Sequence, residues 1–121
     1  MAGRIDPSTP SGGAQGGPLG ASSPRALKHD LRRGEIIWVL KQDYPHMVTF
    51  RHLQLALRDR NIPLSQKDLA SYLSYLEEGG YVRCERRYEE KESLEQILAA
   101  ALTAKGILLL DKKITDPGVR F

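Results

Sequence analysis

The stretch LSQKDLASYLSYLEEGGYVRCERR, residues 64–87, decides the fold class of this 121-residue chain. Ser65 is placed to cap a helix, and Asp68 stands three residues later, as in a variant of the capping box. The glycine pair at 79–80 supplies the permissive backbone with which a chain commonly leaves a helix. The pattern therefore predicts a helix over residues 65–78, with Leu64 and Leu69 as a hydrophobic staple across its start.

The residues after the glycine pair have strand character. Residues 81–88 alternate between two faces, and the charged run at 89–93 is typical of a turn. Residues 94–102 have helical propensity, but an isolated strand needs a partner, so a returning strand is predicted there. A long helix through this region stays the alternative. Thr103 is then placed to cap a short final helix that ends near Asp111.

Two further helices are predicted upstream. Ser23 and Pro24 suit a helix start, and the Tyr44-Pro45 pair is expected to end that helix. Its expected apolar stripe is Leu27, Leu31, Ile37, Trp38 and Leu40. A second helix is expected from a Thr49 cap to about Arg60, with one apolar face formed by Phe50, Leu53, Ala56 and Leu57.

The domain organisation follows from composition. Gly, Pro and Ser fill 14 of the first 24 positions, too polar a mixture to bury a core. Residues 1–24 are therefore expected to be a disordered tail, native or in part an expression leader. Residues 25–113 are expected to form one domain, followed by an irregular C-terminal tail at 114–121.

Composition also bounds the setting of the protein. No apolar run is long enough to span a bilayer and no secretory signal is present, so a soluble cytoplasmic protein is expected. The single cysteine, Cys84, fits a reducing compartment and a small buried hydrophobe. The three histidines do not have zinc-like spacing, and the sequence contains no nucleophile signature. We therefore expect no metal, no cofactor and no enzymatic activity.

The order helix, helix, helix, two-stranded hairpin, helix resembles a winged helix-turn-helix domain, an α+β fold. LSQKDLASYLSYLEEGGYVR resembles the recognition helix and the entry to the wing, and the charged loop resembles the wing tip. ALTAKGILLL is similar to the segment that follows the wing in bacterial regulators of the MarR kind. Together with the terminal DPGVRF, it also resembles small winged-helix proteins of Mu-like phages and prophages. The winged-helix resemblance implies a DNA-binding protein, with transcriptional control as its use, whereas the phage resemblance implies a fold and a compartment rather than an activity.

A helical wheel divides the helix at 65–78 into two sides. Leu69, Tyr72, Leu73 and Leu76 define the buried side, so the side expected to enter a DNA groove carries Lys67, Ser71, Ser74 and Tyr75. Candidate contacts to the DNA backbone are the cations of the first two helices and the wing: Arg25, Lys28, Arg32, Arg51, Arg83, Arg86 and Arg87. A solvated helix face explains the first set equally well, and local ion pairing explains the wing arginines.

A second function stays open, that of a protein-interaction module without DNA binding. Residues 61–80 carry one Lys/Arg against three Asp/Glu, whereas residues 25–60 carry eight against four. The acidic balance of the helix expected to enter the groove is unfavourable for phosphate, because cations dominate affinity for DNA. A homodimer is also possible, with the apolar run at 107–110 either forming its interface or closing the core.

Overall fold

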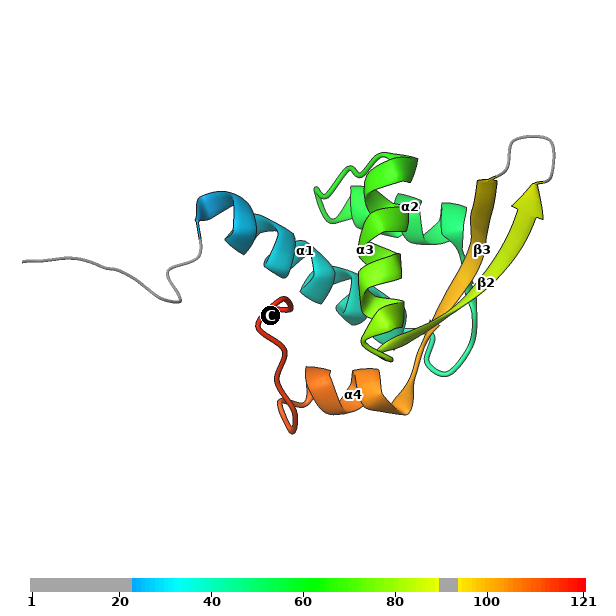
Figure 1. Ribbon diagram of the computed structural model, residues 1–121. Coiled ribbons are helices and arrows are strands. Elements are labelled where there is room, and N and C mark those ends of the chain that lie inside the picture. The colour runs from blue at the N-terminus through cyan, green and yellow to red at the C-terminus, as the bar shows by residue number, and fades with distance from the viewer. Residues whose placement is uncertain (1–22, 90–93) are drawn as a thin grey trace, which may run out of the picture.

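The computed structural model describes residues 23–89 and 94–121 and shows helices packed around a small sheet (Figure 1). Along the chain the elements are α1 (Pro24–Lys41), β1 (Val48–Thr49), α2 (Phe50–Asp59), α3 (Gln66–Glu78), β2 (Val82–Glu89), β3 (Leu94–Leu102) and α4 (Ala104–Leu110). The predicted α+β class and the order of three helices, hairpin and helix are confirmed.

The four helices begin where the sequence predicts, and for the expected reason. In each case the cap hydroxyl accepts a hydrogen bond from the backbone N–H three residues later, which satisfies a donor with no partner inside the helix. The oxygen–nitrogen distances are 3.1 Å at Ser23, 3.2 Å at Thr49, 3.1 Å at Ser65 and 3.1 Å at Thr103. At the other end of α3, Gly80 has a φ of 83°, a conformation that favours glycine.

The sheet is antiparallel with strand order β1-β3-β2. The predicted strand at 94–102 is confirmed, since β3 pairs with β2 from Val82↔Leu102 to Glu89↔Leu94. A register shift between Glu85 and Arg86 interrupts this ladder. The two-residue β1 pairs with the other edge of β3. No periodic pattern in the sequence predicts this strand. Of the turn predicted at 89–93, residues 90–93 lie outside the described part of the chain.

The core lies between the helices and the inner face of the sheet. The predicted buried side of α3 is confirmed, with Leu69, Leu73 and Leu76 fully buried and Tyr72 nearly so. These side chains join Leu53 and Leu57 of α2, Val82 of β2 and Leu109 of α4 in one cluster. Burial of this continuous apolar surface is what holds the elements together.

The predicted apolar stripe of α1 is wrong in part. Leu27, Leu31 and Trp38 are exposed by 36%, 42% and 44%, whereas Ile36, Ile37 and Leu40 are fully buried. The reason is their position around the helix, because Leu27, Leu31 and Trp38 share one side of α1 and the three buried residues lie on the opposite side, which faces the core. The start of α1 also extends beyond the body of the domain (Figure 1). The helix also ends at Lys41, ahead of the predicted stop at Tyr44-Pro45, which lies in the following turn.

Residues 114–121, here named the strap, contain no helix or strand but pack across α1. Val119 is buried in the core, and the backbone N–H of Arg120 donates to the Asp30 carbonyl at 3.0 Å. A Cβ at Gly34 would lie 1.8 Å from the Arg120 carbonyl oxygen, so a glycine at this position allows the strap to approach. The predicted boundaries at 24 and 113 stay predictions, and residues 1–22 lie outside the described chain.

Candidate nucleic-acid interface

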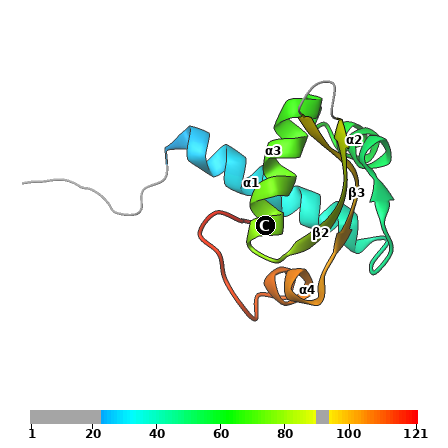
Figure 2. The same ribbon diagram turned by 45° about the vertical axis from the view of Figure 1, so that its right-hand side comes forward.

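The polar face of α3, which we define as Lys67, Ser71 and Ser74, lies opposite the buried leucines. Lys67 and Ser71 are exposed, and Ser74 is half-buried beside Arg86 of β2. The two views agree that the end of α3 that begins at Gln66 lies on the same side as the free end of β2 and β3 (Figures 1 and 2). A duplex on that side could therefore touch both elements.

Tyr75 differs from the expectation, because it is half-buried and does not belong to the polar face. Its hydroxyl donates to Asp116 of the strap at 3.0 Å, and Arg33 of α1 lies 4.0 Å from the centre of its ring. Gly118 also lies against this ring, since a Cβ there would come within 2.0 Å of the Tyr75 hydroxyl. The wheel missed these contacts because they come from the strap, forty residues further along the chain.

Asp116 is the centre of this network. Its carboxylate accepts hydrogen bonds from Tyr75, from the Tyr81 hydroxyl at 2.7 Å and from the backbone N–H of Gly118 at 2.8 Å. Burial alone would raise the pKa of Asp116, but the three donors outweigh it and lower the pKa. The same hydrogen bond, with burial, raises the pKa of Tyr81 to about 12.

The acidic C-terminal end of α3 is partly neutralised by the hairpin. Arg86 of β2 donates to the Glu77 carboxylate through Nε and Nη2, and the same Nη2 lies 3.5 Å from the Ser74 hydroxyl oxygen. Of the predicted backbone contacts, Arg86 is therefore held against α3, as the ion-pairing alternative anticipates. The pair also fixes the hairpin beside the helix.

Arg83 and Arg87 lie on the other face of the hairpin. Val82 and Cys84 pack on the core, so the neighbouring Arg83 points away from it, and it is exposed. Arg87 is opposite Gln96, and both are exposed. These two arginines are thus separated from the polar face of α3 by the thickness of the hairpin.

Among the cations of α1, Lys28 and Arg32 line one groove, whereas His29 lies against α3. His29 contacts the Tyr72 hydroxyl through Nδ1 at 2.5 Å, and Arg32 lies near enough for its charge to oppose the rise that burial causes in the Tyr72 pKa. Arg25 and Arg51 are exposed, the latter in the first turn of α2.

Sequence reasoning missed the role of Arg33, which joins α1 to the strap. It donates to Asp30 at 3.2 Å and to the Gly118 carbonyl at 2.9 Å, while its buried Nε has no partner within residues 23–89 and 94–121. Its i, i+3 spacing from Asp30 was the one signal in the sequence. Its ring contacts with Tyr72 and Tyr75 depend on tertiary packing.

The described residues hold little that supports catalysis. No three His, Cys, Asp or Glu side chains gather there as a metal site would require. Burial raises the pKa of the Cys84 thiol to about 11, which is the opposite of what a reactive thiolate needs. In the same part of the chain, no helix is long and apolar enough to cross a membrane.

Comparisons with known proteins identify the architecture. No protein-family model and no curated protein sequence matches the chain. Solved structures do match, among them a PadR family transcriptional regulator from Eggerthella lenta and a PadR-like transcription factor from Bacteroides fragilis. The first is 20% identical with a TM-score of 0.50, over 74% of this chain and 75% of that one. The second is 16% identical with a TM-score of 0.51, over 72% and 84%.

This chain has a winged helix-turn-helix fold. At these identities the likeness establishes the fold alone. In this fold α2 and α3 are the helix-turn-helix pair, β2 and β3 the wing, and α4 the short helix that follows the wing.

Proposed function

We propose that the protein is a DNA-binding winged-helix regulator, in which the polar face of α3 enters a groove of duplex DNA. The observation that carries this proposal is the common orientation of the start of α3 and the free end of the wing (Figure 2). Lys67 and Ser71 are exposed at that start, where they can reach phosphates or base edges. The two similar structures are a transcriptional regulator and a transcription factor, which supports the same use here.

The Arg86–Glu77 ion pair weakens the main objection to this proposal. The sequence of α3 contains three acidic residues and one cation. In the structure, Arg86 of the wing forms an ion pair with one of these acidic residues, Glu77. The proposed backbone contacts are then Arg51 at the start of α2, where free backbone N–H groups also favour phosphate, and Arg32 beside α3. Arg25, Arg83 and Arg87 stay predictions.

The finer resemblances also stay predictions. The similar structures are named for the PadR family rather than for MarR-like regulators or for proteins of Mu-like phages. The alternative function is a protein-interaction module, and it is favoured by Asp68 and Glu78, which are exposed on the same helix.

Fluorescence-anisotropy titration with mixed-sequence duplexes at several salt concentrations tests the proposal. We expect binding at low salt, and we expect Lys67→Glu to weaken it about tenfold or more and to lower the salt slope by about 1. Lys112→Glu is the matched control, because Lys112 is equally exposed but lies in the turn after α4. Absence of binding at low salt, or equal losses in both variants, would favour the interaction module.

A further inference from the structure

Three large apolar side chains form one exposed stripe on α1. Leu27, Leu31 and Trp38 fall within about 40° of each other around the helix axis, and they are exposed by 36%, 42% and 44%. The stripe extends over three turns, about 16 Å along the axis. Phe121 of the strap lies beside it, since a Cβ at Gly34 would come within 3.3 Å of the Phe121 ring. Exposed apolar side chains gathered in this way are typical of a surface that binds a partner.

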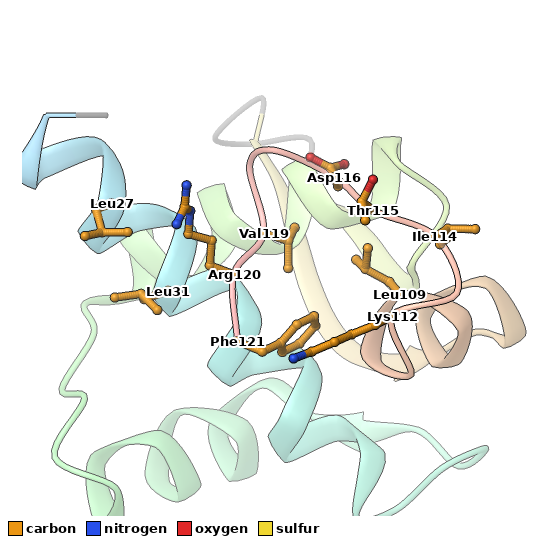
Figure 3. Close-up of a pocket in the computed structure, with 10 residues that line it drawn as sticks. All are labelled: Leu27, Leu31, Leu109, Lys112, Ile114, Thr115, Asp116, Val119, Arg120 and Phe121. Atoms are coloured by element: carbon orange, nitrogen blue, oxygen red, sulfur yellow. The ribbon is translucent and has the colours of Figure 1, made fainter. Parts of the chain in front are cut away.

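A groove lies on each side of this stripe. Figure 3 shows the first, a depression of about 460 Å³, with Leu27 and Leu31 on one side and Val119 and Phe121 of the strap on the other. The second, of about 380 Å³, lies between the same two leucines and Ile62. A ridge between two grooves is the relief against which a helix packs its own rows of apolar side chains.

Cations border the stripe along both grooves. They are Lys112 and Arg120 on the side of the strap, and Lys28 and Arg32 on the other side. The acidic residues nearby are engaged within the chain. Glu35 pairs with Arg60 at 2.7 Å, Asp116 accepts three hydrogen bonds, and Asp30 is buried and pairs with Arg33, with Arg120 at 4.0 Å. The surface therefore presents an apolar stripe between two positive margins.

This combination of relief and charge distinguishes between occupants. In a second copy of the chain the same cations would face each other, and like charges oppose association. A phosphate backbone would match the cations but leave the apolar stripe uncovered, and a bilayer surface would leave the grooves unfilled. A helix with an apolar stripe between two rows of acidic residues matches both features. Arg32 also lies near Tyr72 of α3, so its charge is available to this partner or to DNA.

We propose that the stripe on α1 binds an acidic amphipathic helix of another protein. The apolar side chains of that helix pack into the grooves on either side of Leu27 and Leu31. Its carboxylates pair with Lys28 along one margin and with Lys112 and Arg120 along the other. Because the strap forms one wall of the first groove, the bound helix also holds the strap against α1. This surface is separate from the polar face of α3.

Fluorescence anisotropy with a labelled synthetic peptide tests the proposal on the full chain. The probe has about 14 residues, about 21 Å as a helix, with leucines in one helical stripe and glutamates at the other positions. One control peptide carries lysine in place of every glutamate, and another has the same leucines distributed around the helix. We expect the acidic peptide to bind about tenfold more tightly than either control, and more weakly as the salt concentration rises.

Variants of the chain locate the bound peptide. Leu31→Asp should raise its dissociation constant about a hundredfold, because a carboxylate would lie in the apolar contact. Leu55→Asp is the matched control, since Leu55 is similarly exposed, by 40%, on α2. Lys112→Glu should weaken peptide binding about fivefold and leave duplex binding unchanged, whereas Lys67→Glu should do the reverse. Circular dichroism checks that each variant keeps its helices.

Three results would overturn the proposal: no binding of the acidic peptide, equal binding of the lysine peptide, or a Leu31→Asp variant that binds like the wild type. Two other measurements test the other occupants. Co-sedimentation with vesicles of phosphatidylcholine and phosphatidylglycerol, or a dimer in sedimentation equilibrium, would assign the stripe to a membrane or to a second copy if Leu31→Asp abolished it. Peptide binding without duplex binding supports this surface and removes the proposed function, and duplex binding without peptide binding does the reverse.

Discussion

The two sides of α3 carry similar residue types but are engaged differently. On the strap side, Tyr72 and Tyr75 are held by His29, Arg33 and Asp116. On the polar face, the hydroxyl of Ser71 and the charge of Lys67 are exposed to solvent. The residue types of a helix side therefore do not show whether that side packs or binds, because the partners of the packing side come from segments distant in sequence.

The first prediction breaks the strap side at its centre. Asp116→Ala leaves the hydroxyls of Tyr75 and Tyr81 and the N–H of Gly118 without their acceptor. Hydrogen bonds to a charged group are individually worth about 1.5–3 kcal/mol, so we expect the free energy of unfolding to fall by about 3 kcal/mol. Urea denaturation measures it, with Asp111→Ala, at an exposed site after α4, as the control. A loss no greater than that of the control would contradict the network.

Alkali should weaken the same network. The pKa of Tyr81 is raised from 10.0 to about 12 in the folded protein, by its hydrogen bond to Asp116 and by burial. The folded state thus favours the neutral phenol, and its contribution to stability is complete below pH 10 and disappears as pH rises towards 12. Thermal unfolding between pH 8 and 12 should show a larger fall for the wild type than for Tyr81→Phe. Parallel curves would contradict the assignment.

Gly34→Ala should displace the strap from α1. Alanine favours a helix by about 1 kcal/mol over glycine, but its Cβ would overlap the Arg120 carbonyl. Because overpacking typically costs about 1–3 kcal/mol, we expect a net loss of about 1–2 kcal/mol. Urea denaturation, with proteolysis after Arg120 as a second readout, measures the effect. A more stable variant would show that the strap gives way freely.

A double-mutant cycle on Arg86→Gln and Glu77→Gln tests the ion pair that holds the wing against α3, between the two sides of this helix. The pair is partly buried, with side-chain exposures of 26% and 33%. We expect a coupling energy of about 1 kcal/mol, slightly above that of exposed pairs. Additive effects on the free energy of unfolding would mean that the pair does not hold the wing against α3.

The smallest effect on stability is expected on the polar face. Ser71→Ala should change the free energy of unfolding by less than about 0.5 kcal/mol, since the side chain is exposed and alanine favours a helix. Its affinity for duplex DNA should nevertheless fall, which anisotropy titration measures. A stability loss equal to that of Asp116→Ala would erase the distinction between the two sides.

Local signals in the sequence were enough for the helix starts and the turn into the wing. The hydroxyls of Ser65 and Thr103 bond within three residues, so their roles can be predicted without tertiary structure. The return of β3 followed from the need of β2 for a partner. The cap hydrogen bonds join residues that are close in sequence, and the strand pairing satisfies backbone groups that need hydrogen-bond partners.

Long-range contacts explain what the sequence could not predict. Tyr75 was assigned to the exposed side because the strap that covers it carries no periodic signal. Leu27, Leu31 and Trp38 have the spacing of a buried stripe, yet they lie on the side of α1 opposite Ile36, Ile37 and Leu40, which face the core. Periodicity identifies a side that can be buried, and the length of the neighbouring elements decides how much of it is.

The position of β3 in the middle of the sheet connects three distant parts of the chain. At one edge it pairs with β1, whose Thr49 caps α2, and at the other with β2. It ends beside Thr103, which caps α4 and also donates to the Gly80 carbonyl at 2.6 Å. The wing is therefore joined through β3 to the starts of both α2 and α4, so its tilt is coupled to the placement of these two helices.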